Sequence, residues 1–248
     1  MLLVNLLTKV YSDSLFVAID EFLQFALKGL KVETKISGFT TRGWVQISVS
    51  GEDEKVALHY LAEEIGLCIT RLEDVKKFAI VKGYVTSISK SKDKIYVDIG
   101  IHSPKNVDVA VPLQCLQAQL LDGKKAPLRE IVGLFGFCEN LPLSIKIFKI
   151  DKENYSIEAL LSESQLGRYR HWKKSLLQRL IVLGASLEEI KLALKTAKCN
   201  RDIVEIEPLG LFEYAVTCKL GTDATGLIPK IGKNLRNATL AVFNPEKW

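Results

Sequence analysis

The sequence lacks any apolar run long enough to cross a bilayer. Its apolar start, residues 1–14, has no basic leader and no small-residue cleavage site, so it does not resemble a secretory signal. We interpret this start as a strand of a folded domain and expect a cytoplasmic protein. The 248 residues, 48% hydrophobic and 25% charged, are typical of a globular protein with two or three domains.

Cysteine is sparse and follows no metal or disulfide pattern. Zinc ligands normally come in closely spaced pairs such as CxxC or HxxxH, and the chain contains neither pair. The cysteines are odd in number, widely separated and embedded in apolar segments: Cys68, Cys115, Cys138, Cys199 and Cys218. We expect buried free thiols in a reducing compartment, and no metal or other cofactor.

Catalytic signatures are also lacking. The histidines are scattered, with no nucleophile at motif spacing: His59, His102 and His171. GTDATG, residues 221–226, lacks the lysine of a phosphate-binding loop. Three aspartates that could in principle assemble a metal site are explained more simply as soluble residues on strand faces: Asp93, Asp98 and Asp108. We therefore expect a protein that is not an enzyme.

Charge, in contrast, is unevenly distributed along the chain. Residues 1–75 contain 7 Lys and Arg against 11 Asp and Glu, a net charge of −4. Residues 76–248 contain 27 against 18, a net charge of +9. This asymmetry favours contact between the later part and a polyanion, with a different role for the first part. A merely solvated basic surface is the simpler alternative.

Residues 1–75 combine strand and helix patterns. MLLVNLLTKVY predicts a strand, and a helix capped by Ser12 or Asp13 follows over SLFVAIDEFLQFALKGL. KVETKIS and GWVQISVSG alternate polar and apolar residues, as half-buried strands do, and EDEKVALHYLAEEIG predicts an amphipathic helix. The order βαββα predicts a two-layer domain with both helices on one face of a sheet.

Residues 76–161 have a different pattern, rich in strands. FAIVKGYVTSISKSKDKIYVDIG predicts a hairpin whose turn is rich in lysine. NVDVAVP, LPLSIKIFKID and YSIEALL predict three more strands, with a helix or loop excursion over residues 113–140. Five short strands with one longer excursion predict a closed barrel of the OB type.

Several motifs within residues 78–161 resemble the RNA-binding domain named after ribosomal protein S-one, which is an OB-fold. They are VKGYVTSI, IYVDIG, DVAVP, LSIKIFKID and SIEALL. The resemblance implies an RNA-binding barrel. That family often has an aromatic residue in its first turn, and this chain has SKSKDK there, so the resemblance does not supply base stacking at the turn.

Residues 162–199 are predicted to be helical. Ser162 or Ser164 can cap a helix through QLGRYRHWKKSLLQRLIVL, and Ser186 with Glu189 has capping-box spacing for LEEIKLALKTAK. A barrel followed by such a helix is similar in layout to the alpha subunit of archaeal translation initiation factor two. In that subunit, a helical domain and then an α/β domain follow the barrel.

Residues 200–248 repeat a pattern of the barrel: YVDIG followed by VAVP is matched by YAVTCKLG followed by GLIP. The repeat predicts a C-terminal β-rich, barrel-like module, either a second, truncated barrel or a sheet that completes one, with strands that include TGLIPKIG. The predicted fold class is therefore multidomain α+β: a βαββα domain (1–75), an OB-type barrel (76–161), a helical segment (162–199) and a C-terminal β-rich module (200–248). The whole chain resembles a family of archaeal proteins with an S-one-like domain, which implies no specific function.

The predicted hairpin of the barrel contains the first group of candidate binding residues. OB-type barrels hold single strands with basic side chains on the phosphates and aromatic rings stacked on the bases. Strand alternation places Lys82 and Tyr84 on one face, and Lys94, Tyr96 and Asp98 on the same face of the next strand. Lys90 and Lys92 lie in the turn. We expect this face to be exposed; an ordinary solvated face with cross-strand tyrosines is the alternative.

The second group lies in RYRHWKK, residues 168–174. Its cations are Arg168, Arg170, Lys173 and Lys174. Arginine can pair bidentately with phosphate. Trp172 shares a stripe with leucines at helical spacing, so we expect it to anchor a core.

These patterns favour an RNA-binding protein of translation or RNA processing, whose partners are RNA and a ribosomal or other RNA–protein complex, with no membrane contact. The alternative is a protein–protein adaptor in a ribosomal or transcription assembly that uses the acidic first domain. A third hypothesis makes LLQRLIVLGASLEEIKLALK a helix-turn-helix for duplex DNA. It is weaker because Lys191 and Lys195 stand among apolar side chains unsuited to base edges.

Overall fold

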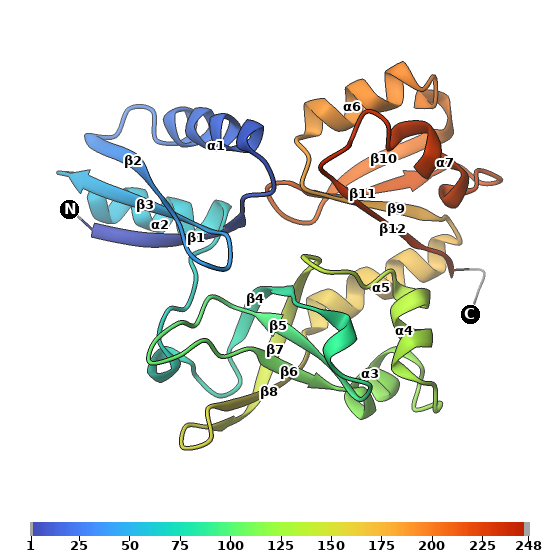
Figure 1. Cartoon of the computed structure of the whole chain (residues 1–248), viewed down its shortest axis with the longest axis horizontal. Helices are drawn as coiled ribbons and strands as arrows, with labels where there is room; N and C mark the ends of the chain where they lie inside the picture. The colour runs from blue at the N-terminus through green and yellow to red at the C-terminus, as the bar shows by residue number, and fades with distance from the viewer. Residues whose placement is uncertain (1, 246–248) are drawn as a thin grey trace.

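A computed structural model describes residues 2–245, apart from the side chains of residues 13 and 14. It consists of an N-terminal domain, a barrel with its helices, and a C-terminal sheet domain (Figure 1). The fold class predicted from the sequence is confirmed. No helix in the described part of the chain has both the length and the apolar character needed to span a membrane.

The N-terminal domain has the predicted βαββα order. Its elements are β1 (Leu2–Lys9), α1 (Asp13–Ala26), β2 (Val32–Phe39), β3 (Trp44–Gly51) and α2 (Glu54–Glu64). The antiparallel sheet has the order β1-β3-β2, so the central strand is β3. Val45, Ile47 and Val49 of β3 are buried in one cluster with Ile19 of α1 and Leu61 of α2. Both helices therefore cover the same face of the sheet, as predicted.

The central strands form a closed barrel. After a short 3-10 turn, η1 (Leu72–Asp74), its strands are β4 (Ile80–Val85), β5 (Lys94–Asp98), β6 (Val109–Pro112), β7 (Pro142–Asp151) and β8 (Ser156–Leu161). Around the barrel they follow the order β4-β5-β6-β8-β7, with β6 and β8 parallel and the other neighbours antiparallel. This order, with the first strand beside the fourth, is the Greek-key arrangement of the OB type.

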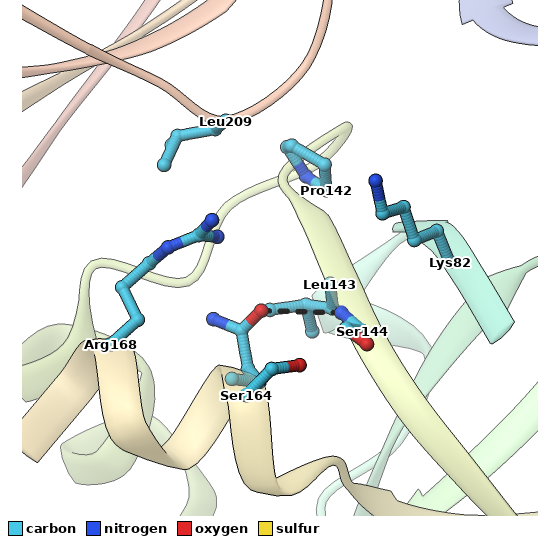
Figure 2. Close-up of a pocket in the computed structure, with 8 residues that line it drawn as sticks. Lys82, Pro142, Leu143, Ser144, Ser164, Arg168 and Leu209 are labelled. Atoms are coloured by element: carbon cyan, nitrogen blue, oxygen red, sulfur yellow. Dashed lines mark hydrogen bonds between the residues drawn. The ribbon is translucent and has the colours of Figure 1, made fainter. Parts of the chain in front are cut away.

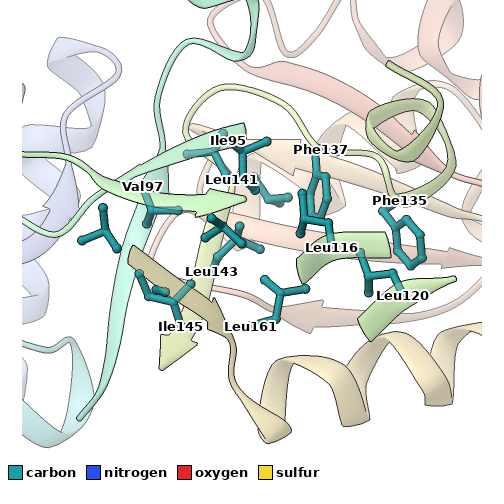
Figure 3. Packing of buried hydrophobic residues seen from close by; sticks show 14 of the residues in the cluster. Ile95, Val97, Leu116, Leu120, Phe135, Phe137, Leu141, Leu143, Ile145 and Leu161 are labelled. Carbon is teal, nitrogen blue, oxygen red and sulfur yellow. The ribbon is translucent and has the colours of Figure 1, made fainter. Parts of the chain in front are cut away.

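The barrel core is apolar and extends into two helices. The predicted excursion over residues 113–140 forms α3 (Leu113–Leu120) and α4 (Leu128–Phe135), and a 3-10 turn, η2 (Ile88–Lys90), lies between β4 and β5. Ile95, Val97 and Leu143 point inward from the strands and pack in one cluster with Leu116 and Phe135 from the helices (Figure 3).

Helix α5 (Glu163–Ser175) follows the barrel and ends earlier than predicted. Ser162 caps it by accepting a hydrogen bond from the Gln165 amide, which confirms one of the two predicted caps. Leu176 then adopts a left-handed φ of 55°, and the prediction that the helix continues to residue 183 is wrong. Residues 179–183 instead form β9 (Arg179–Leu183), which is buried throughout.

The C-terminal sheet explains why β9 is apolar on both faces. It consists of β10 (Ile203–Pro208), β11 (Glu213–Cys218), β9 and β12 (Thr239–Phe243), in the antiparallel order β10-β11-β9-β12. Leu180 and Val182 pack in a cluster with α6 (Leu187–Thr196) and α7 (Ala224–Ile231). Ile181 and Leu183 belong to the cluster of the barrel and α5. A strand buried on both sides loses the period-2 alternation, so its pattern resembles that of a buried helix.

Two further predictions in this region are wrong, although the module is β-rich. TGLIPKIG forms α7, whose N-cap Asp223 accepts hydrogen bonds from the Thr225 and Gly226 amides, so the pattern shared with the barrel does not repeat its structure. The helix-turn-helix hypothesis also fails, because the first of its two helices is the strand β9. The predicted capping box of Ser186 and Glu189 at the start of α6 is confirmed.

Candidate nucleic-acid interface

The outward face of β4 and β5 carries the side chains that strand alternation predicts. Tyr84 pairs across the strands with Asp98, and Val85 pairs with Val97. Val85 and Val97 belong to the barrel core, so the residues that alternate with them point outward. Whether that face is open depends on what packs against it.

The N-terminal domain covers the middle of this face, around Tyr84. Tyr84 is 1% exposed, and its ring meets Trp44 edge-to-face with centroids 5.2 Å apart. Its hydroxyl donates to the Leu7 carbonyl at 3.3 Å. The prediction that Tyr84 stacks on a base is therefore wrong: the ring lies on the expected face, but another domain packs over it.

Asp98 is the centre of a buried ionic cluster beneath the same domain. It is 0% exposed and accepts hydrogen bonds from Trp44 Nε1 at 3.0 Å and from the Gly100 amide at 2.9 Å. Lys9 Nζ lies 3.5 Å and Arg42 Nη1 3.4 Å from its carboxylate, and Arg42 also pairs with Asp108. Burial lowers the pKa of Lys9. Asp98 and Asp108 thus hold two domains together, and their prediction as merely soluble strand residues is wrong.

A second buried carboxylate, Glu213 of β11, brings the C-terminal domain to the same junction. Its Oε1 accepts from the Tyr11 hydroxyl at 2.7 Å, and its Oε2 accepts from the Tyr84 hydroxyl at 3.1 Å and from the Phe212 amide at 3.3 Å. Burial raises the pKa of Glu213 to about 7, against the opposing effect of these hydrogen bonds. All three domains therefore meet at Tyr84. Sequence analysis missed these contacts because the partners are up to 202 residues apart in the chain.

One end of the face, at the start of β5, stays open. Lys94 Nζ lies 5.6 Å from the centroid of the Tyr96 ring, and both side chains are partly exposed. Lys90 and Lys92 of the preceding loop are exposed. In the part of the chain that the structure describes, these three lysines form no ion pair. A partly exposed ring flanked by unpaired cations is what stacking and phosphate contact require.

Two predicted residues from distant parts of the sequence meet elsewhere, at a groove beside α5. Lys82 of β4 and Arg168 of α5 both line it, together with Pro142, Ser144 and Leu209 (Figure 2). The cavity measures about 240 Å³. Arg168 Nε is held at 3.1 Å by Glu207 of β10.

The other cations of α5 are dispersed. Arg170 Nη1 lies 3.6 Å from Glu163 on the same helix, and Lys173 and Lys174 are exposed. Trp172 is 2% exposed and donates from Nε1 to Glu207 at 2.9 Å, which confirms that it anchors a core. The structure thus brings only Arg168 of this helix to the same groove as a predicted barrel residue.

Protein-family models match each of the three domains. The N-terminal, central and C-terminal domain models of DUF2110 match residues 3–69, 75–173 and 177–243. The chain belongs to the DUF2110 family. The DUF2110 central domain model covers the barrel strands and α5 up to Lys173. The barrel and its basic helix therefore lie within one family domain. A search of curated proteins found no match.

Several solved structures are similar to parts of this DUF2110 chain at low TM-scores. An uncharacterized protein from Methanocaldococcus jannaschii is 13% identical over 36% of this chain and 96% of its own, with a TM-score of 0.25. A chain of the a/eIF2alpha–aDim2p–rRNA complex from Pyrococcus horikoshii OT3 is 11% identical over 50% and 64%, with a TM-score of 0.26. The intact alpha subunit of aIF2 from Pyrococcus abyssi is 10% identical over 68% and 97%, also at 0.26. The identification of the barrel as an S-one-type domain stays a prediction.

Candidate metal ligands are dispersed over the described part of this DUF2110 chain. Among the described residues, no group of three or more His, Cys, Asp or Glu side chains is placed to hold a metal ion. All five cysteines are free thiols. Burial raises the pKa of Cys138 to about 12 and of Cys218 to about 11, so both are protonated at neutral pH.

Proposed function

We propose that the protein binds RNA at the open end of the barrel face, through Tyr96 and the lysines of the β4–β5 loop. The observation that carries this proposal is the partly exposed Tyr96 ring with Lys94 5.6 Å from its centroid, beside Lys90 and Lys92. Its setting supports it: the barrel is of the OB type, and residues 76–248 carry a net charge of +9.

Each part of this surface has a distinct physical role. The lysines neutralise phosphates and release counterions, which gives affinity without sequence preference. The Tyr96 ring offers a stacking platform for one base, worth about 1–3 kcal/mol. Because Tyr84 is buried, the surface has one tyrosine where the sequence predicts two. We therefore expect modest affinity from the barrel face.

Filter binding of single-stranded RNA oligomers over a range of salt concentrations tests the proposal. The logarithm of the binding constant falls linearly with the logarithm of the salt concentration. For single strands, the slope becomes steeper by about 0.7 for each phosphate that a cation neutralises. Lys90→Glu and Lys92→Glu should each flatten that slope, and Tyr96→Ala should weaken binding about tenfold with the slope unchanged. Lys28→Glu, at an exposed lysine of the N-terminal domain, is the matched control and should have little effect.

Absent or salt-insensitive binding would remove the proposal. If Lys28→Glu and Lys92→Glu weaken RNA binding equally, the affinity comes from the net charge of the protein and not from the barrel face.

A second candidate function is an adaptor that docks a basic partner on the N-terminal domain, as in a ribosomal or transcription assembly. Lys9 and Arg42, two of the seven cations in residues 1–75, are turned toward the barrel by Asp98 and Asp108. The outer surface of this domain is therefore more acidic than its net charge of −4 indicates. Partners recovered from lysate that survive nuclease treatment would favour the adaptor over RNA binding.

A further inference from the structure

Two basic side chains, Lys82 and Arg168, line a groove between the barrel, α5 and Leu209 of the C-terminal domain. Lys82 projects from β4 on one side of Pro142, and the Arg168 guanidinium reaches toward Pro142 and Leu209 from α5 (Figure 2). Ser144 and Ser164 line the groove between them, and Asp and Glu are absent from the described residues that line it. The groove therefore offers hydrogen-bond donors and positive charge, which is the chemistry that binds a phosphate group.

Arg168 is held in place for such contact. Its Nε lies 3.1 Å from Glu207 Oε1, and the same carboxylate accepts from Trp172 Nε1 at 2.9 Å through its other oxygen. Within the described chain, the two terminal nitrogens of Arg168 take part in no hydrogen bond. Lys82 is exposed and has no ion pair there either. The guanidinium is thus oriented at one edge while its outer edge stays available.

The groove is separate from the RNA-binding surface proposed above. Lys82 and Tyr96 lie toward opposite ends of the outward face of β4 and β5, and Tyr84 and Asp98 lie between them. Trp44 packs on that middle section and contacts both residues. A ligand in the groove therefore does not touch Tyr96 or the β4–β5 loop.

The groove adjoins a second cleft whose walls are partly apolar and partly polar. Lys82, Pro142, Arg168 and Leu209 line both spaces, and the second measures about 400 Å³. Its other walls come from all three domains: Leu7, Phe22, Glu64, Ile65, Tyr84, Pro208, Gly210, Leu211 and Tyr214. Apolar side chains such as Phe22 and Leu211, next to the two cations, suit a ligand with a flat ring at one end and an anion at the other.

We propose that this junction binds one nucleotide unit, with its phosphate held by Lys82 and Arg168 and its base in the adjoining cleft. The site goes beyond the barrel-face function, because it requires groups from all three domains and none from the β4–β5 loop. The nucleotide unit has two possible sources, a free mononucleotide or an RNA strand. Both present anionic phosphate oxygens to the two cations, about two charges from a terminal phosphate and one from a phosphodiester.

Isothermal titration of the full chain with adenosine 5′-monophosphate (AMP) tests the phosphate contact, with adenosine as the phosphate-free control. Removing one charge-assisted hydrogen bond should weaken binding about tenfold or more, so Lys82→Ala and Arg168→Ala should each do so. Adenosine should bind more weakly than AMP by at least the same factor. Lys92→Ala should leave AMP binding unchanged, because Lys92 lies on the other surface. Thermal denaturation checks that Arg168→Ala, which also removes the ion pair with Glu207, is folded; Lys82 has no ion pair of this kind.

A parallel titration with a single-stranded RNA oligomer distinguishes the sources. If AMP binds and binding depends on Lys82, a free nucleotide is a sufficient ligand for the groove. This result would hold even if the RNA titrations of Lys92→Glu showed that the barrel face does not bind RNA. If AMP does not bind, an RNA affinity that falls about tenfold in Lys82→Ala assigns the phosphate to a strand. The proposal is overturned if Lys82→Ala and Arg168→Ala leave both titrations unchanged, or if adenosine binds as tightly as AMP.

Discussion

Glu213 is a carboxylate buried away from water at the junction of the three domains. It is 0% exposed and bound by the hydroxyls of Tyr11 and Tyr84, one from each of the other two domains. A Cβ atom on Gly210 would lie 2.1 Å from Glu213 Oε2, so only glycine fits beside the carboxylate at that position. Three domains and a tight loop are thus built around one acidic group.

Glu213 should make the stability of the protein depend on pH. Its pKa is raised from 4.5 to about 7, so between these values the folded state keeps a proton that the unfolded state has released. Stability therefore falls as pH rises through this window, by at most about 3 kcal/mol. In urea unfolding, the free energy of the wild type minus that of Glu213→Gln should decrease from pH 4.5 to pH 7. Glu153→Gln, at an exposed turn, is the control; a difference that stays constant with pH for Glu213→Gln contradicts the prediction.

At the scale of elements, strand β4 has no room for a larger side chain at Gly83. Gly83 lies opposite Leu143 of β7, and a Cβ atom there would lie 2.5 Å from the Asp98 carbonyl oxygen and 2.7 Å from side-chain atoms of Val97 and Ile99. The barrel can close at this point because β4 carries no side chain there.

Gly83→Ala should therefore destabilise the protein by about 1–3 kcal/mol through overpacking. Gly167 in α5 is the matched control: nothing lies within 4 Å of its added Cβ, and alanine favours a helix by about 0.5–1 kcal/mol over glycine. Thermal unfolding of both variants should show shifts of opposite sign. A Gly83→Ala variant as stable as the wild type would show that the barrel can open at this point.

Which elements the sequence predicts depends on whether each has one buried face or two. The alternating strands β2 and β3 and the capped helices α5 and α6 begin where their patterns predict. The pattern of β9 predicts a helix because the two faces of this strand enter different cores, which removes the alternation. Residues 226–229 resemble the VAVP strand, but the Asp223 cap that starts α7 lies just before them. Local pattern alone does not separate these cases.

At the scale of the whole molecule, the domains are joined by buried charge. Asp98→Ala would leave Lys9 and part of Arg42 without a partner beneath the N-terminal domain, which typically costs about 3–5 kcal/mol. Asp93→Ala, in the exposed loop of the same hairpin, is the matched control and should leave stability nearly unchanged. Urea denaturation followed by tryptophan fluorescence measures both. An Asp98→Ala destabilisation below about 1 kcal/mol would mean that water replaces the carboxylate at the junction.

This junction also explains which candidate site residues sequence analysis could place. Alternation assigned Lys82, Tyr84, Lys94 and Tyr96 to one face, and that assignment is confirmed. Exposure is a property of domain packing, and no local pattern reveals that Trp44, 40 positions before Tyr84, packs on it. No local pattern reveals that Lys82 and Arg168 line one groove either, because this requires α5 to return beside β4 and β7.

The position of Trp44 over the middle of the barrel face has a consequence for any strand that lies there. A chain of nucleotides running along β5 from the loop meets the N-terminal domain after a few bases and has to turn aside. The barrel can then hold only a short stretch, at the lower end of the roughly 4–16 nucleotides that an OB fold covers. Under the proposed RNA binding, this wall would set where a strand leaves the barrel face, and the acidic N-terminal domain, with its net charge of −4, would repel the backbone that follows.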